Sequence, residues 1–288
     1  MTLGFIGLGS LGTPIAQNLI DSGHELYIYN RTASKIIPLA EKGAVACDSI
    51  PALARACTLV FSIVSDDAAL KSITEGENGL LNNLSAGSIH VSLSTVLPAT
   101  ASQLAEQHIQ HGQQYLASPV FGRPEAAAAR KLNFVVAGPA ALQSTVTPLL
   151  KDAGGAGIWD FGEDITAANT VKLCGNFLIA AAMEAIGESV ALASASGVDA
   201  SLMWNLFNQT LFNTPVYHNY SKTIIQQQFE PGAFTMQLGL KDMNLALRQA
   251  ASVQQKMPLA NLLQEHMQQL VEEGRGHIDW SAVATAVR

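Results

Sequence analysis

The sequence is poor in charged residues, in cysteine and in aromatic side chains. Only 14% of its 288 residues are Asp, Glu, Lys or Arg, and the formal net charge of −7 comes without any basic block. An acidic chain with no cluster of Lys or Arg binds nucleic acid or an anionic membrane poorly, so we expect neither as a partner. The seven histidines form no HxH or HExxH spacing, and we expect no metal site.

Cysteine and long apolar runs are equally scarce. Cys47, Cys57 and Cys174 are widely spaced and form no CxxC pair, a pattern that favours reduced thiols over a disulfide framework. The longest uninterrupted apolar run, FLIAAAM at 177–183, is too short to cross a bilayer. The N-terminus lacks the positive start of a signal peptide and enters a strand-like pattern at once. We therefore expect a soluble cytoplasmic protein.

The chain does contain enough hydrophobic residues, 48%, to bury a sizeable core in one or two domains. In its first part, strand-like and helical patterns alternate, which predicts a doubly wound, mainly parallel sheet. The strand-like runs begin with LGFIGL at 3–8 and ELYIYN at 25–30, and they end with QYLASPV at 114–120, LNFVVAG at 132–138 and GIWDFG at 157–162.

After Gly162 the pattern becomes helical, starting with a long, mostly apolar stretch without proline from Asp164 to Ser196. We predict an α/β fold with a Rossmann domain over 1–162 and an all-α domain over 163–288, joined by a long interdomain helix.

A glycine-rich loop, Gly7-x-Gly9-x-x-Gly12, lies between the first expected strand and helix. Glycine at these positions permits a tight turn, close approach of a pyrophosphate and close helix packing. The following helix N-terminus offers N–H groups to phosphate. GxGxxG alone is a weak signal, but the strand–helix–strand context makes it a dinucleotide site, with Gly7, Gly9, Leu11 and Gly12 contacting the cofactor.

The second strand is followed by Asn30, Arg31 and Thr32, where many dinucleotide sites carry an acidic residue that binds the ribose hydroxyls. The guanidinium of Arg31 can instead bind a 2′-phosphate bidentately, and Asn30 and Thr32 can donate further hydrogen bonds. The alternative is a solvated arginine in a surface turn. The position favours NADP(H) as the cofactor.

Lys172 and Asn176 lie four residues apart in the apolar helical stretch and therefore share one helix face. A lysine there is costly unless it lines a cleft. A desolvated ammonium has a lowered pKa, which suits it to proton transfer near neutral pH. The alternative is a lysine that extends its ammonium to solvent beside a cap-like asparagine.

Five segments occur in a familiar order: residues 4–35, SLSTVLP, ASPVFG, the Lys172/Asn176 helix and LGLKDMNLA. Together they resemble the β-hydroxyacid dehydrogenase family, which includes 3-hydroxyisobutyrate dehydrogenase and glyoxylate/succinic semialdehyde reductases. The resemblance covers essentially the whole chain. It implies a nicotinamide-binding Rossmann domain and a helical, 6-phosphogluconate dehydrogenase-like C-terminal domain, usually assembled as a dimer; we expect a homodimer or homotetramer.

The resemblance also implies roles for individual residues. Lys172 matches the general acid/base and Asn176 its substrate-contacting neighbour. Thr95, which follows Ser94, matches a contact of nicotinamide and substrate. Further cofactor or active-site contacts are implied at Ser65, Asp66 and Lys241. Without the resemblance, Lys241-Asp242 reads as an exposed pair on an amphipathic helix.

The substrate loop departs from the family pattern Asp-Ala-Pro-Val-Ser-Gly-Gly. Here the last three residues are Phe121, Gly122 and Arg123, so a hydroxyl is lost and a ring face is gained. Arg123 either binds the substrate carboxylate or pairs with a surface acid such as Glu125. The change admits a larger or less polar carbonyl compound.

The leading interpretation is an NADPH-dependent reductase of a small aldehyde or keto acid, reversible as a hydroxyacid dehydrogenase. Imine reductases share the architecture but usually lack the lysine, so Lys172 favours carbonyl chemistry and the altered loop keeps imine reduction open. A non-catalytic, dehydrogenase-like module is the remaining alternative, and the intact glycine loop and Lys172 argue against it.

Overall fold

The computed structural model describes residues 1–286. The chain divides into two compact units, Met1–Lys172 and the part from Leu173 onward, which are described separately. This division falls inside helix α9 (Ile165–Ala195), whereas the sequence placed the boundary just before that helix.

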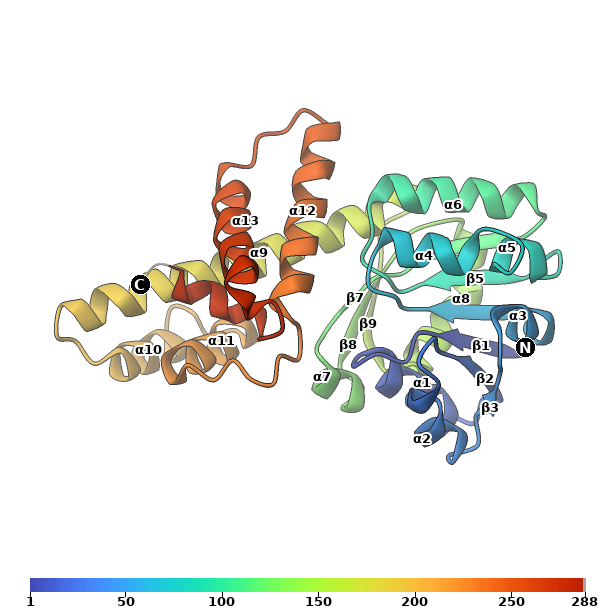
Figure 1. Cartoon of the computed structure of the whole chain (residues 1–288), viewed down its shortest axis with the longest axis horizontal. Coiled ribbons are helices and arrows are strands. Elements are labelled where there is room, and N and C mark those ends of the chain that lie inside the picture. Colours follow the sequence, from blue (N-terminus) through green and yellow to red (C-terminus); the bar gives the residue numbers. More distant parts are fainter. Residues whose placement is uncertain (287–288) are drawn as a thin grey trace. The chain divides into compact units, whose positions relative to one another are not determined.

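The first unit is built on a parallel six-stranded sheet, which confirms the Rossmann architecture (Figure 1). The register pairs Leu3 of the first strand with Leu26 on one side and with Leu59 on the other. The central strands are buried along their whole length, as in parallel sheets covered on both faces. In spatial order the strands are β3 (Val45–Ala46), β2 (Leu26–Tyr29), β1 (Leu3–Ile6), β4 (Leu59–Ser62), β5 (Ile89–Ser92) and β6 (Gln114–Ala117).

Helices cover both faces of this sheet. Phe5 packs with residues of α1 (Gly12–Asp21) and α8 (Ala140–Asp152) on one face. Its neighbour Ile6 packs with residues of α3 (Ile50–Ala56) and α5 (Leu80–Asn83) on the other. This alternation follows from the two-residue period of a strand. The helical segments of this unit are α1 (Gly12–Asp21), η1 (Ala33–Lys35), α2 (Ile37–Ala40), α3 (Ile50–Ala56), α4 (Asp67–Thr74), α5 (Leu80–Asn83), α6 (Pro98–Gln110), α7 (Pro124–Ala128) and α8 (Ala140–Asp152).

A second, three-stranded sheet is the main departure from the expected organisation. The run expected as one strand, QYLASPV, is broken at Ser118-Pro119, because proline cannot donate to a ladder. The chain then forms β7 (Val120–Phe121), which pairs antiparallel with β8 (Leu132–Val136), and β8 pairs parallel with β9 (Gly155–Asp160). The last strands therefore build a small sheet of their own and do not extend the large one.

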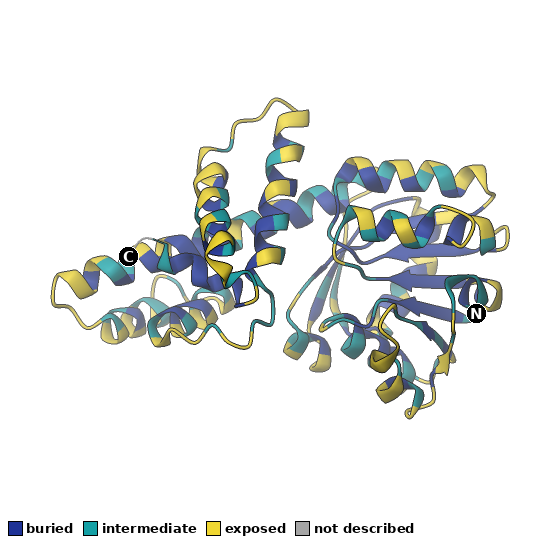
Figure 2. Cartoon of the chain, viewed as in Figure 1, coloured by how far each residue is buried: buried dark blue, intermediate teal, exposed yellow. Residues whose placement is uncertain are grey.

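The second unit is helical. Its core gathers Met183 and Ile186 of α9, Leu263 and Met267 of a later helix, and Trp280. Figure 2 shows buried stretches alternating with exposed ones along the helices of this unit. Close approach is possible at Gly187, where a Cβ would lie 2.7 Å from Ala284. After α9 the elements are α10 (Ala200–Gln209), α11 (Pro215–Gln226), α12 (Met236–Ser252), α13 (Pro258–Leu270), η2 (Val271–Arg275) and η3 (Trp280–Thr285).

Aromatic residues of this unit pack mainly on one another. The rings of Trp204 and Tyr217 are stacked with centroids 6.1 Å apart, and Phe212 lies 4.8 Å from Tyr217. Trp204 is buried in the helical core. His218, beside them in sequence, is exposed and bonds to Asn213.

Helix α9 is long and apolar enough to cross a membrane by length and composition, with a mean hydropathy of 1.5 over 18 residues, of which 44% are buried. The sequence predicted no such segment, because its longest uninterrupted apolar run, 177–183, is short and polar residues such as Glu184 interrupt the apolar sequence of α9. Core helices of soluble domains pass the same test, and α9 supplies Ala180, Met183 and Ile186 to the helical core.

Candidate active site

The glycine loop follows β1, the strand at which the sheet order reverses and where doubly wound folds bind ligands. Gly7 has φ of 101°, and a Cβ there would lie 2.0 Å from the carbonyl oxygen of Ile63. A Cβ on Gly12 would lie 2.0 Å from the carbonyl oxygen of Gly7. Gly9 differs, because its Cβ would meet nothing within 4 Å. The space beside Gly9 fits a pyrophosphate, whereas Gly7 and Gly12 are required by the protein itself.

Asn30 ties the glycine loop to the turn after β2. Its Oδ1 accepts the N–H of Leu8 at 2.9 Å, and its Nδ2 donates to the carbonyl oxygen of Thr32 at 2.9 Å. Asn30 thus shapes the turn in addition to any contact it makes with the cofactor. Arg31 and Thr32 are exposed, and the Arg31 guanidinium has no partner among residues 1–286. It is available to an anion.

The next two strands, β4 and β5, end in loops that are joined to each other. The hydroxyl oxygen of buried Ser94 accepts the N–H of Val64 at 2.9 Å. Asp66 caps α4 by accepting the N–H of Ala69, and Ser65 donates to the same carboxylate. Thr95, half-buried, therefore lies on a loop braced against the loop of Ser65 and Asp66.

Two buried histidines lie on β5 and α6, the elements on either side of the Thr95 loop. His90 of β5 bonds to Ser62 at 2.8 Å and to His108 of α6 at 3.2 Å, and His108 bonds to the carbonyl oxygen of Leu104 at 2.7 Å. Burial lowers the pKa of His90 well below its usual value and lowers the pKa of His108 to about 4. Both rings are neutral at physiological pH and form part of the core.

Lys172 is buried, with only 9% of its surface exposed, and its Nζ lies 4.1 Å from the centre of the Phe121 ring. This is a cation–π contact. Phe121, at the end of β7, is the residue that replaces the family's serine. Gly122 follows with φ of 144°, where a Cβ would lie 2.4 Å from Leu132, and Arg123 stands at the N-terminus of α7.

In the second unit, Asn176 donates from Nδ2 to Oδ2 of Asp242, and Asp242 Oδ1 lies 2.6 Å from the Lys241 ammonium. Asp242 is 1% exposed. A buried carboxylate needs such charged and hydrogen-bonding partners. The Lys241-Asp242 pair is therefore not the exposed pair that amphipathic spacing suggested, since Asp242 links Lys241 to Asn176.

In the first unit, two residues that the sequence analysis did not single out hold the segment after Thr95. Asn169, 1% exposed, accepts the N–H of Val96 at 3.4 Å, and Asp67 bonds to the start of α6. A signal existed for Asn169: with Lys172 and Asn176 it occupies positions i, i+3 and i+7 of α9, one polar stripe on an apolar helix.

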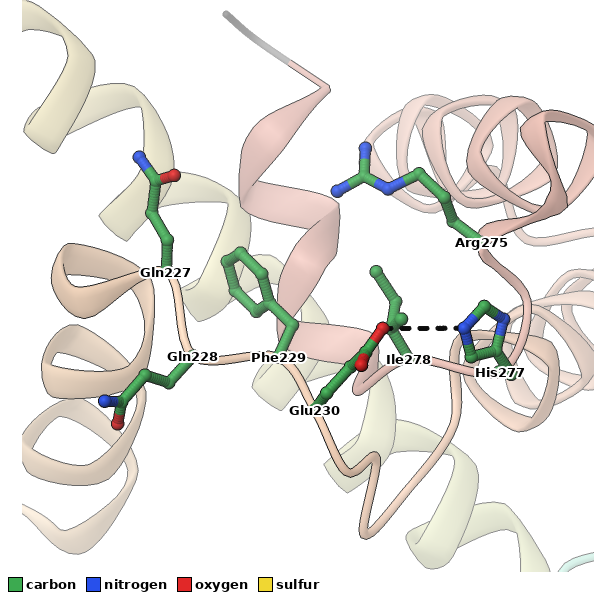
Figure 3. A pocket seen from close by; sticks show the side chains of 7 residues that line it. All are labelled: Gln227, Gln228, Phe229, Glu230, Arg275, His277 and Ile278. Carbon is green, nitrogen blue, oxygen red and sulfur yellow. Dashed lines mark ion pairs between the residues drawn. The ribbon is translucent and has the colours of Figure 1, made fainter.

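A hollow of about 470 Å³ lies elsewhere, in the second unit (Figure 3). An ion pair of 3.6 Å joins two of its lining residues, Glu230 and His277, whose side chains are both 71% exposed. None of the residues predicted from the sequence lines it. The lining residues are Gln227, Gln228, Phe229, Glu230, Arg275, His277 and Ile278.

Comparison with known proteins covers both units. Residues 2–167 match the NAD-binding domain of 6-phosphogluconate dehydrogenase, and residues 166–287 match the domain of NADP-dependent 3-hydroxyisobutyrate dehydrogenase described as NAD-binding. The chain is 39% identical to an uncharacterized oxidoreductase, YfjR, of Bacillus subtilis, over the full length of both. It is 31% identical to glyoxylate/succinic semialdehyde reductase 2 of Arabidopsis thaliana, covering 100% of this chain and 80% of the relative.

Among solved structures, Psf3 in complex with NADP+ and 2-OPP superimposes with a TM-score of 0.90 at 24% identity, covering both chains completely. A reductive aminase of Aspergillus terreus, in complex with NADPH and ethyl levulinate, gives 0.65 at 24% identity, covering 100% of this chain and 99% of the other. At these identities the likeness shows the shared fold.

Proposed function

The chain belongs to the β-hydroxyacid dehydrogenase family of NAD(P)-dependent oxidoreductases, and from that premise we propose that it is an NADPH-dependent reductase of a small aldehyde or keto acid. The observation that carries the proposal is Lys172, a buried ammonium held against the Phe121 ring on a helix that also bears Asn176.

The chemistry divides between cofactor and chain. A bound nicotinamide supplies the hydride that the carbonyl carbon accepts. Lys172 donates a proton from Nζ to the carbonyl oxygen as negative charge develops on it, and accepts the proton in the reverse direction. Thr95, on its braced loop in the first unit, is expected to hold a substrate oxygen atom. Asn176, in the second unit, is oriented by Asp242. The Phe121 ring steadies the ammonium and presents an apolar surface to the substrate.

The preference for NADPH rests on Arg31. An exposed guanidinium that has no partner in the described part of the chain, placed directly after β2, suits a 2′-phosphate. Arg31→Ala is expected to raise the KM for NADPH about tenfold or more, the value of one charge-assisted hydrogen bond, and to leave the KM for NADH unchanged. Arg55→Ala, on an exposed arginine bonded to Asn83, is the control. Equal effects on both cofactors would contradict the assignment.

The substrate class rests on Phe121, Gly122 and Arg123. A ring in place of a hydroxyl favours a carbonyl compound with an apolar portion, and Arg123 offers a cation for a carboxylate. The glyoxylate/succinic semialdehyde reductase of Arabidopsis thaliana is similar over the whole chain. Glyoxylate, succinic semialdehyde and longer semialdehydes, each assayed with NADPH and NADH, form the panel that identifies the preferred substrate.

Substitution of the lysine tests the mechanism. Lys172→Met keeps the length of the side chain but removes the proton, and turnover is expected to fall by roughly 10²-fold or more while NADPH still binds. Lys151→Met, on an exposed lysine of α8, is the matched control. Undiminished turnover in Lys172→Met would overturn the assignment of this residue.

Imine reduction is the second candidate. It is supported by the fold shared with the reductive aminase and by the loss of the loop serine at Phe121. A cyclic imine and succinic semialdehyde, assayed side by side for NADPH oxidation, separate the two activities, because each compound offers only one of the two double bonds, C=N or C=O, to the hydride.

We also place a second copy of the chain on the helical unit. Leu178 and Leu192 of α9 are 64% and 70% exposed, and Ala185, exposed midway between them, would be the centre of an antiparallel pairing of two α9 helices. Further exposed apolar side chains of this unit are Val198, Leu202, Leu206 and Leu211. A homodimer in the cytoplasm, where Cys47, Cys57 and Cys174 stay free, agrees with these features.

A further inference from the structure

Asp67, the first residue of α4, reaches across to the start of α6. Its Oδ1 accepts the backbone N–H of Leu97 at 3.0 Å and the hydroxyl of Thr100 at 2.6 Å. Helix α6 has no capping side chain of its own, because Leu97 occupies the cap position and Pro98 the first turn. The carboxylate of Asp67 therefore supplies the cap from another element, where a negative charge also favours the helix dipole.

The segment that Asp67 holds is the loop of Thr95. The flanking residues Leu93, Ser94 and Val96 are almost completely buried, whereas Thr95 is half-buried. On one side of Thr95 the hydroxyl of Ser94 is bonded to the N–H of Val64. On the other side, Asn169 accepts the N–H of Val96 and Asp67 that of Leu97. Thr95 is thus held between anchored neighbours.

Helices α4 and α6 run alongside each other (Figure 1), and polar side chains connect them at several points. The contact of Asp67 with Thr100 is the one at the N-terminal ends of both helices. Farther along the same faces, Lys71 donates to Gln103 at 2.9 Å and Gln107 donates to Glu75 at 3.2 Å. These bonds join α6 to α4 and to Glu75, the residue that follows α4, and neither bond involves a residue of the Thr95 loop. They provide a comparison for separating helix packing from loop geometry.

We propose that Asp67 is a positioning residue of the reaction, which acts by setting the backbone of the loop that carries Thr95. The inference rests on the proposed function, because it requires Thr95 to contact substrate or nicotinamide. A displacement of about 1 Å in such a group costs up to about 10²-fold in rate. Loss of the Asp67 acceptor leaves the Leu97 N–H without its partner and lets the loop relax.

The test compares kinetic constants of purified full-length variants with the panel substrate that the wild type reduces best. Asp67→Ala is expected to lower kcat about tenfold with the KM for NADPH unchanged. Asp67→Asn retains an oxygen that accepts from both Leu97 and Thr100, so it is expected to restore most of kcat. The double variant Lys71→Ala, Gln103→Ala removes a contact between the same helices and is expected to keep the wild-type kcat.

A double-mutant cycle identifies the route. If Asp67 acts through Thr95, Asp67→Ala costs little further activity in a Thr95→Ala background. If the wild type is active, three results would overturn the inference and leave the proposed function standing. They are an undiminished kcat in Asp67→Ala, a loss of kcat equal to that of the Lys71/Gln103 variant, and additive losses in the double-mutant cycle. A wild type inactive towards every carbonyl and imine overturns the proposed function, and the inference with it.

Discussion

Gly9→Ala is expected to separate cofactor binding from stability. The new methyl group meets no protein atom within 4 Å, and the φ of Gly9 is not positive, so the free protein gains roughly 0.4–1 kcal/mol from the less flexible unfolded chain. The same methyl group occupies the space in which the pyrophosphate approaches the loop. NADPH affinity is expected to fall at least about tenfold, or about 1.4 kcal/mol.

Gly7→Ala is the matched comparison and should behave in the opposite way. Its Cβ would lie 2.0 Å from the Ile63 carbonyl oxygen at a φ of 101°, so the loop must move, at a cost of roughly 3 kcal/mol or more. Urea unfolding of the free proteins and fluorescence titration with NADPH measure the two quantities. Wild-type NADPH affinity in Gly9→Ala, or marked destabilisation by this substitution, would refute the reasoning.

Three further predictions concern the core, the second unit and assembly. Burial holds the pKa of His108 at about 4 against an ordinary value of 6.5, so the unfolded state binds more protons and stability falls as pH drops from 6.5 towards 4. Urea unfolding should show a loss of about 2 kcal/mol from this group between pH 7 and pH 5. The same dependence of stability on pH in His108→Gln as in the wild type would contradict this prediction. Asp242→Asn, which leaves Lys241 and Asn176 without their carboxylate, should lower the unfolding free energy by about 1–3 kcal/mol, and full retention of stability would show that the buried charge contributes nothing. Leu192→Glu should convert the proposed dimer to a monomer in light scattering, while Ile109→Glu, at an equally exposed position of the first unit, should not; dimers in both variants would place the interface elsewhere.

The sequence predicted the features that depend on local pattern. The glycine loop, the alternation of strands and helices and the long helix after Gly162 all follow from spacing over a few residues, and the structure confirms the α/β fold with its helical partner. The small sheet was not foreseen as a separate sheet, because pairing partners of β7, β8 and β9 are a property of the folded chain. The break at Pro119 was the one local sign of it.

Some residues of the candidate site could likewise be predicted from local sequence, and others could not. Lys172 and Asn176 could be selected because they interrupt an apolar helix, and their roles stay predictions. Asp67 could not, because its partners lie 30 and 33 residues away, and nothing local distinguishes it from Asp66. Asp242 was noticed only beside Lys241, since its bond to Asn176 spans 66 residues. Bridges between distant segments appear only when the elements have packed.

The separate small sheet has a consequence for how this enzyme can diversify. Phe121, the residue that departs most from the family pattern, lies on β7, whereas the glycine loop and Arg31 follow strands of the large sheet. Under the proposed roles of these residues, mutations at the end of β7 are expected to change the choice of substrate while leaving cofactor recognition intact. Gly122 limits that freedom, because Leu132 fills the space of any side chain there. A library for new carbonyl substrates is best confined to Phe121 and Arg123.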